Sequence, residues 1–341
     1  MTQPPDALAV PAVSRPARRR IRLADGAARL RLMAITGIAT VLITRAYLAA
    51  TGYPKVGGGT IHIGHVLWGG LLMIAALTVA LVWVGKRAQN WTALLGGVGI
   101  GLFVDEVGKY LTTTNDYFYR PAAAIIYLLF AALLVVASLL GRDSAAEAVD
   151  PGDRLAAAAQ VAAGGLVSGL TSEERAQALR MLEGCPAPDR AAIEQLLSSA
   201  PGREPGRWAR LWSRLRRFVE WVAQLRFAEA VVFALMVMSH VIVAIIFTVQ
   251  ALTGEPHTDD AGAVTASAVT RGVSAVLVLA ATWLRVRSRR AAAYRLARAA
   301  ILLDLLVTEI FNFHDSQFGA IAELPWLLAA FIFLTIWQRD L

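Results

Sequence analysis

Two histidines three residues apart, His62 and His65, stand at the start of an apolar stretch. On a helix this spacing places both imidazoles on one face, where they could share a divalent metal ion such as zinc. Further ligands must come from elsewhere, and Asp105, Glu106 and Asp116 supply candidate carboxylates. We therefore name His62, His65 and Asp116 as candidate metal ligands. The alternative is that the histidines only form hydrogen bonds at the membrane surface.

Asp105, Glu106 and Lys109 form a second candidate group within about one helical turn. Beside a metal, one carboxylate could act as general base for a bound water, and the lysine could hold an anionic group. These three are the candidate catalytic residues. The competing interpretation is structural, because Lys109 follows the two acids at the spacing that favours ion pairs on a helix, and Arg45 offers a second cation.

Four polar residues are candidates for substrate binding. Asn115 and Tyr117 follow the acidic group in a short loop, while Arg271 and Glu309 lie far along the chain in apolar surroundings. Arg271 is expected to pair with Glu309 across a helical bundle. His240 and Asp304 lie deeper, near the middle of apolar stretches. They form either a proton relay or a buried hydrogen-bonded pair, and both alternatives stay open.

The elements that must position these residues are apolar stretches of membrane-spanning length. The 341 residues are 57% hydrophobic with a mean hydropathy of +0.54, and the single cysteine allows no intrachain disulfide. Blocks of about twenty apolar residues are long enough to cross a bilayer as helices. The sequence thus predicts an all-α integral membrane protein with eight spans. They cover Leu32–Ala50, His62–Val84, Trp91–Leu111, Pro121–Leu140, Phe227–Leu252, Ala263–Leu284, Tyr294–Phe313 and Ile321–Trp337.

The distribution of basic residues predicts the orientation. Of 33 Lys and Arg residues, 28 fall in segments that would share one side of the membrane, whereas the opposite loops hold only Lys55 and Arg120. This asymmetry follows the positive-inside rule and places both termini in the cytoplasm. The net charge of +8 then points to anionic lipids of the inner face, not to nucleic acid. The expected location is a bacterial cytoplasmic (plasma) membrane.

Two four-helix halves, residues 32–140 and 227–341, look like copies of each other. Thr51-Gly52-Tyr53-Pro54 and Thr253-Gly254-Glu255-Pro256 follow the first span of each half. From the proline to a glutamate in the third span is 52 residues in the first half (Glu106) and 53 in the second (Glu309). Four spans are an even number, so the sequence predicts two parallel repeats.

Glycines in the first half predict close helix packing. Gly97 and Gly101 form a GxxxG pattern in the third span, and Gly69-Gly70 occurs in the second. Small residues at this spacing let membrane helices approach each other closely.

The remaining segments are cytoplasmic in this scheme: a basic N-terminal segment, residues 1–31, and a linker, residues 141–226. In the linker, Thr171 and Glu174 form a capping-box pattern, and Asp189 precedes a short amphipathic run. From Trp208 to Val222, apolar residues recur at helical spacing with arginines interleaved. This pattern predicts an amphipathic helix in the inner membrane interface.

The stretch from Tyr53 to Tyr127, about a quarter of the chain, resembles an uncharacterised type of bacterial polytopic membrane protein. The motifs that carry the resemblance are the HxxH of His62-Ile63-Gly64-His65, the DExxK of Asp105–Lys109 and the NDYFY that begins at Asn115. This type has no known activity, so the resemblance implies an architecture and no mechanism.

Three functions fit these observations. The first is a metal-assisted hydrolase of a lipid-like substrate near the outer leaflet. The second is a proton- or ion-coupled transporter, favoured by the duplicated halves, although broken helices at matching places are not evident in the sequence. The third is a membrane sensor or assembly factor with the linker as its output. The oligomeric state cannot be inferred from any of these features.

Overall fold

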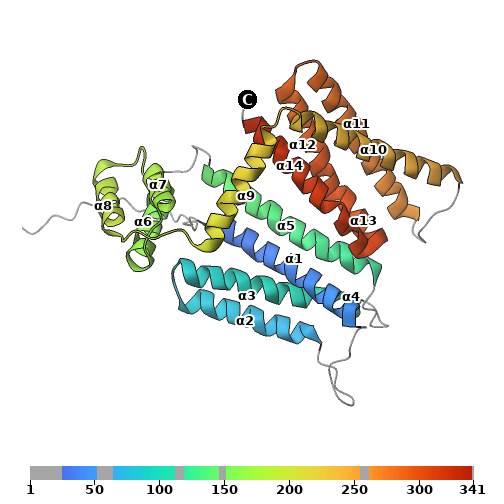
Figure 1. Cartoon of the computed structure of the whole chain (residues 1–341). Coiled ribbons are helices and arrows are strands. Elements are labelled where there is room, and N and C mark those ends of the chain that lie inside the picture. Colours follow the sequence, from blue (N-terminus) through green and yellow to red (C-terminus); the bar gives the residue numbers. More distant parts are fainter. Residues whose placement is uncertain (1–24, 52–63, 112–118, 146–150, 254–260, 340–341) are drawn as a thin grey trace, which may run out of the picture. The chain divides into compact units, whose positions relative to one another are not determined.

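In a computed structural model of the chain, residues 25–51, 64–111, 119–145, 151–253 and 261–339 are described (Figure 1). These residues are helical almost throughout, and their only β pairing is an isolated bridge between Leu170 and Gly202. The α-helices of the first half and the linker are α1 (Gly26–Thr51), α2 (His65–Val82), α3 (Lys86–Asp105), α4 (Val107–Leu111), α5 (Arg120–Ala145), α6 (Pro151–Ser168), α7 (Ser172–Met181), α8 (Ala187–Ser199) and α9 (Arg207–Ala223). The second half contains α10 (Ala228–Thr253), α11 (Ala261–Val286), α12 (Arg290–Leu303), the π-helical turn η1 (Asp304–Thr308), α13 (Glu309–Ser316), the 3-10 segment η2 (Gln317–Ala322) and α14 (Leu324–Arg339).

Among the described residues, six helical segments are long and apolar enough to cross a membrane. They are Gly26–Thr51, His65–Val82, Lys86–Lys109, Pro121–Gly141, Thr265–Val286 and Phe318–Gln338. A seventh candidate arises if the bent pair of α9 and α10 counts as one span. The predicted class, an all-α multi-pass membrane protein, is therefore confirmed. The predicted seventh span is not among the candidates, because residues 290–316 are divided among α12, η1 and α13.

Close contacts at glycine pack α3 between α1 and α2. A Cβ atom added to Gly101 would lie 2.7 Å from the Gly37 carbonyl oxygen on α1, and one added to Gly99 would lie 2.8 Å from the Gly69 oxygen on α2. Gly101 thus allows close approach of α1, and Gly99 allows close approach of α2. The predicted role of Gly69 agrees with this packing, whereas a Cβ on Gly70 would meet nothing within 4 Å.

The second half packs around a buried apolar core. Phe233 and Met236 of α10, Val278 of α11, Ile301 of α12 and Leu334 of α14 belong to it. Around this core, many large apolar side chains remain exposed on the outward faces, as expected for helices that face lipid. Beside this core, Trp337 Nε1 donates a hydrogen bond of 2.9 Å to the Ala223 carbonyl at the end of α9.

Helical geometry changes locally at Glu106 and directly before Glu309. In the first half α3 ends at Asp105, Glu106 leaves helical geometry (φ −90°, ψ 1°), and α4 begins at Val107. In the second half the π-helical turn η1 ends at Thr308 and α13 begins at Glu309. Neither interruption was evident in the sequence. Neither break contains the proline or glycine that usually marks a kink.

Residues Leu140–Glu204 belong to a second, smaller compact unit. Helices α6, α7 and α8 enclose a core that contains Ala158, Ala162, Leu182 and Leu197. The predicted capping box at Thr171 and Glu174 is confirmed, with both reciprocal hydrogen bonds present. The linker is thus a folded three-helix unit followed by α9, more than a tether with amphipathic helices.

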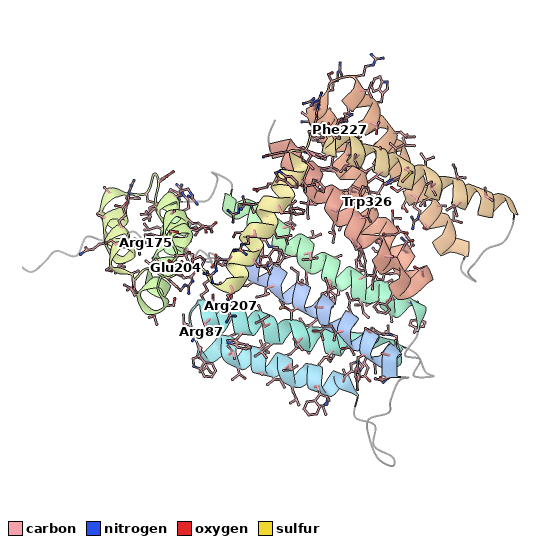
Figure 2. The ribbon with its side chains drawn as sticks, in the orientation of Figure 1. Arg87, Arg175, Glu204, Arg207, Phe227 and Trp326 are labelled. Carbon is pink, nitrogen blue, oxygen red and sulfur yellow. The ribbon has the colours of Figure 1, made fainter. Side chains whose placement is uncertain are left out.

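Helix α9 turns sharply into α10, with an angle of 85° between them. In Figure 2, Arg207 marks the beginning of α9 and Phe227 marks the turn into α10. The apolar face of α9 is exposed in the described structure, including Trp212, Phe218 and Trp221. A helix nearly perpendicular to its apolar neighbour α10, with exposed aromatic residues and interleaved arginines, is consistent with the predicted interfacial helix.

Candidate functional site

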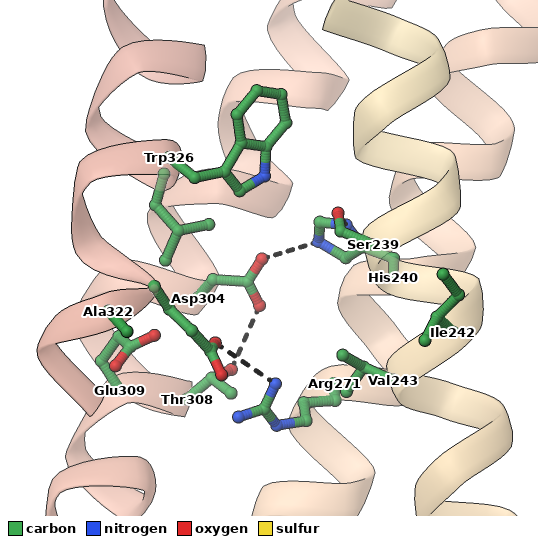
Figure 3. A pocket seen from close by; sticks show the side chains of 12 residues that line it. Ser239, His240, Ile242, Val243, Arg271, Asp304, Thr308, Glu309, Ala322 and Trp326 are labelled. Carbon is green, nitrogen blue, oxygen red and sulfur yellow. Dashed lines mark hydrogen bonds and ion pairs between the residues drawn. The ribbon is translucent and has the colours of Figure 1, made fainter. Parts of the chain in front are cut away.

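A cavity of about 320 Å³ lies in the second half, between α10, α11, the η1–α13 region and α14 (Figure 3). Its polar walls come from residues on four different elements, and its remaining walls are apolar. The lining consists of Ser239, His240, Ile242, Val243, Arg271, Asp304, Thr308, Glu309, Ala322, Glu323, Trp326 and Leu327. Concave, mostly apolar sites with a few convergent polar groups are the usual form of small-molecule sites.

Asp304, the first residue of the π-helical turn, is the centre of a hydrogen-bond network in this cavity. Its Oδ2 atom lies 2.8 Å from His240 Nε2 and accepts a hydrogen bond of 2.8 Å from the Ser274 hydroxyl. Its Oδ1 atom accepts a longer hydrogen bond, 3.3 Å, from Thr308 Oγ1. The carboxylate is only 6% exposed, so these partners replace the water that it loses on burial. The two residues suggested as a relay are therefore in direct contact.

His240 faces hydrogen-bond acceptors at both ring nitrogens. Nε2 meets Asp304, and Nδ1 lies 2.7 Å from the Met236 carbonyl oxygen one turn earlier on α10. A carbonyl can only accept, so Nδ1 must carry a proton. The contact at Nε2 then needs a second proton, either on the imidazole or on the carboxyl. The His240–Asp304 contact is therefore a place where one further proton would bridge the two side chains.

Glu309 occupies another wall of the cavity and is 1% exposed. Its Oε1 atom accepts a hydrogen bond of 3.3 Å from Asn312 Nδ2. Its Oε2 atom accepts no hydrogen bond from the described residues. The expected direct pair with Arg271 is replaced by an indirect link, because Arg271 donates to Asn312 Oδ1. Arg271 also lies 3.6 Å from Glu323 Oε2, which is the ion pair drawn in Figure 3.

The first half contains a separate cluster around Asp105, which is fully buried. Arg45 Nε donates to Asp105 Oδ1 at 2.5 Å, and Arg45 Nη2 donates to the Asp105 carbonyl oxygen at 3.0 Å. His65 Nε2 lies 3.1 Å from Asp105 Oδ2. The Asp105 carboxylate is thus paired with the Arg45 guanidinium from α1. This is the ion pairing that the sequence analysis named as the alternative to a catalytic role.

Glu106 fills the break between α3 and α4 and reaches two partners. Lys109 Nζ lies 2.5 Å from Glu106 Oε1, and the backbone N–H of Val66 donates to Glu106 Oε2 at 2.7 Å. Val66 is the second residue of α2, so the carboxylate caps the amino terminus of that helix, where negative charge is favoured. A Cβ atom on Gly64 would lie 2.5 Å from the carboxylate, which explains glycine at this position.

Of the predicted metal ligands, only His65 lies within the described residues. His62, Asn115, Asp116 and Tyr117 lie outside the described residues. Among the residues that are described, no three histidine, cysteine, aspartate or glutamate side chains form a group that could hold a metal ion.

Sequence reasoning missed Ser274, which donates to Asp304, and two lining residues of the cavity, Glu323 and Trp326. Ser274 follows Arg271 by three residues, so helical spacing could have indicated it. Glu323 directly precedes α14 and could have been noticed as a charged residue within the predicted last span. Trp326 gives no such signal, because tryptophan is common near the ends of membrane helices.

Comparison with known proteins gives no relative: no family model, no curated protein and no solved structure matches the chain. Any function must therefore be argued from the geometry of the two polar clusters.

Proposed function

We propose that the chain is a proton-coupled transporter of a small solute, with eight spans in two parallel four-helix halves of a bacterial cytoplasmic membrane. The observation that carries the proposal is the contact of 2.8 Å between His240 Nε2 and Asp304 Oδ2 in the wall of the cavity. Ionisable pairs inside membrane bundles are costly and are typical of proton pathways in carriers.

The pair offers a simple means of coupling. With its extra proton, His240 bridges α10 to the η1 turn. Without that proton, the Met236 carbonyl or the Asp304 carboxylate would face an imidazole lone pair, and the bridge would weaken. Protonation would thus favour one arrangement of α10 against η1, and a solute that prefers one arrangement would be coupled to the proton.

The interrupted helices support a carrier with duplicated halves. Transporters commonly form their solute sites where helices are discontinuous at corresponding places of two repeats. Here the breaks lie at Glu106 and directly before Glu309. The second half has one more residue between its proline and its glutamate, and a π-helical turn accommodates one inserted residue. If the halves are copies, the π-helical turn is explained as the place where the second half accommodates its one additional residue.

The eight-span topology then counts α10 and the broken α12–η1–α13 segment as spans. Both termini and the smaller unit lie in the cytoplasm, in agreement with the distribution of arginine and lysine.

A metal-assisted hydrolase is the second candidate, favoured by the approach of His65 to both acids, 3.1 Å to Asp105 and 3.9 Å to Glu106. Against it, these carboxylates are paired with Arg45 and Lys109, which compete with a metal. Mass spectrometry of metal bound to the purified chain, beside the His62→Ala/His65→Ala variant, separates the two proposals. Stoichiometric zinc that is lost in the variant would favour the hydrolase.

A sensor or assembly factor is the third candidate, and the folded three-helix unit of α6–α8 is the observation in its favour. A transporter needs no such unit, whereas a sensor needs an output domain. Loss of transport on removal of this unit, without loss of solute binding, would place it in the transport cycle.

The transport proposal is tested in vesicles that contain the reconstituted chain and a pH-sensitive dye. Under an imposed proton gradient, organic cations, organic anions, amino acids and sugars are added in turn. We expect one class to dissipate the gradient, and Asp304→Asn to slow that dissipation roughly tenfold or more. Ser138→Ala is the control, since the Ser138 hydroxyl bonds only to its own helix. Equal rates in wild type and Asp304→Asn would contradict the proposal.

A further inference from the structure

The cavity contains one carboxylate that its cations do not balance. Asp304 is matched by His240, and Glu323 lies within 3.6 Å of Arg271. No described cation lies within ion-pair distance of Glu309, and its Oε2 atom accepts no hydrogen bond from the described residues. A buried carboxylate without a partner is costly and would be stabilised by a cation from outside.

Glu106, the corresponding glutamate of the first half, has an ammonium partner that Glu309 lacks among the described residues. Lys109, three residues after Glu106, places its ammonium 2.5 Å from Glu106 Oε1. Asn312, three residues after Glu309, makes the corresponding contact from its amide at 3.3 Å. The second half therefore keeps the acid and the geometry but replaces the ammonium by a neutral group.

The other walls of the cavity fit the body of an organic molecule. Ile242, Val243, Leu327 and Trp326 line it, and its volume of about 320 Å³ is at the lower end for small-molecule sites. The Trp326 ring offers an aromatic surface to a cation, and its buried indole N–H has no acceptor among the described residues.

We propose that this cavity binds a small protonated organic amine, whose ammonium contacts Glu309 as Lys109 contacts Glu106. The amine's apolar body lies against Trp326, Val243 and Leu327. This inference rests on the proposed transport function and gives its substrate class. Because the proton resides on the His240–Asp304 pair and the amine on Glu309, the two occupy different carboxylates of one cavity.

Calorimetry on the full chain in lipid nanodiscs tests the inference with three probes that share one body. Phenethylammonium carries a positive head, 2-phenylethanol a neutral head and phenylacetate a negative head. We expect measurable binding of phenethylammonium, with affinity at least roughly tenfold above that of either other probe. Preference for phenylacetate would show that Arg271 dominates the cavity and would overturn the proposal.

Two variants test the position of the ammonium. Glu309→Gln removes the charge at nearly constant shape, and we expect it to weaken phenethylammonium binding roughly tenfold or more. Asn312→Lys supplies an internal ammonium three residues after the acid, as in the first half, and should block the amine. Glu173→Gln, which removes a charge from an exposed side chain of α7 outside the cavity lining, is the matched control and should leave binding within about threefold of wild type. Undiminished binding in both test variants would overturn the proposal.

Failure of the amine-site proposal can be distinguished from failure of the transport proposal. Binding that is lost in Glu309→Gln, without proton movement in vesicles, would support the amine site and contradict transport. Proton movement driven by another solute class, with no amine binding, would support transport and contradict the amine site. Unaltered melting temperatures of the variants exclude misfolding as the cause.

Discussion

The two glutamates at the helix breaks differ in their partners. Glu106 is balanced by the Lys109 ammonium and by the Val66 N–H, so its charge serves the fold. Among the described residues, Glu309 accepts a side-chain hydrogen bond only from the Asn312 amide. The proposed amine site rests on this difference.

The capping role of Glu106 predicts a penalty for a side chain at Gly64. In Gly64→Ala the new Cβ would lie 2.5 and 2.6 Å from the two carboxylate oxygens, too close for van der Waals contact. Glu106 must then leave the amino terminus of α2, and we expect a loss of about 1–3 kcal/mol in stability. The melting temperature of the purified variant in nanodiscs should fall by several degrees.

Gly70→Ala is the control for this prediction, because a Cβ there meets nothing within 4 Å. It should melt close to the wild-type temperature. Equal melting temperatures for both variants would show that Glu106 is not needed as the cap of α2.

Sequence reasoning identified the chemistry of these residues better than their partners. Asp105, Glu106, His240 and Asp304 stood out because charged side chains are rare in apolar stretches. The pairing of Arg45 with Asp105, across 60 residues of chain, depends on how α1 packs on α3 and is not a local property. The same holds for the cavity, which exists only where four elements meet.

At the scale of elements, the π-helical turn η1 predicts that one deletion is tolerated. Removing Leu306, which is 38% exposed, would let residues 304–308 close into an α-helix. Because the π-helical turn accommodates one inserted residue, residues beyond the deletion would keep their direction relative to Asp304. We expect both helical content and phenethylammonium binding to persist, because Glu309 stays in the cavity wall.

Circular dichroism and calorimetry on the deletion variant check this prediction. The matched control is Leu306→Ala, which keeps the chain length and therefore the turn. Loss of amine binding after the deletion, with helical content and Leu306→Ala binding unchanged, would show that the π-helical turn does more than absorb one inserted residue.

The amphipathic helix α9 is proposed to lie in the inner interface and to contact anionic lipids. Its exposed Trp212, at 65% exposure, should then be immersed among lipid headgroups. We expect a spin label at Trp212→Cys, in a Cys185→Ser background, to collide more with oxygen than with a water-soluble nickel complex. A label at Arg214→Cys on the arginine-rich face should show the reverse. Equal water exposure at both positions would place α9 outside the membrane.

Local signals predicted the elements well, and tertiary effects explain the exceptions. The capping box of α7 and the amphipathic pattern of α9 depend on residues a few positions apart, so the sequence contains them. The breaks at Glu106 and η1 contain neither proline nor glycine, and periodicity alone continues a helix through them. The break at Glu106 has its partner in α2, at Val66, which only the folded chain supplies.

At the scale of the whole molecule, the number of spans decides which loops share a side. With eight spans, Thr258 lies outside while Ser288 and the C-terminus lie inside. If neither α10 nor the α12–η1–α13 segment crosses, the six remaining segments place Thr258 inside and Ser288 outside. If α10 crosses and the broken segment does not, Ser288 stays inside and the C-terminus moves outside.

Single cysteines therefore distinguish all three topologies in a Cys185→Ser background. Thr258→Cys, Ser288→Cys and a cysteine added after Leu341 are treated in intact cells with a maleimide that does not cross membranes. We expect labelling of Thr258→Cys alone, because the arginines around Ser288 and before the C-terminus hold those segments in the cytoplasm. Ser198→Cys, on the exposed surface of α8, is the internal control and should react only after the cells are opened. Labelling of Ser288→Cys but not of the C-terminal cysteine in intact cells would place Asp304 and Glu309 on a helix that does not cross, and the cavity would lose its place within the membrane.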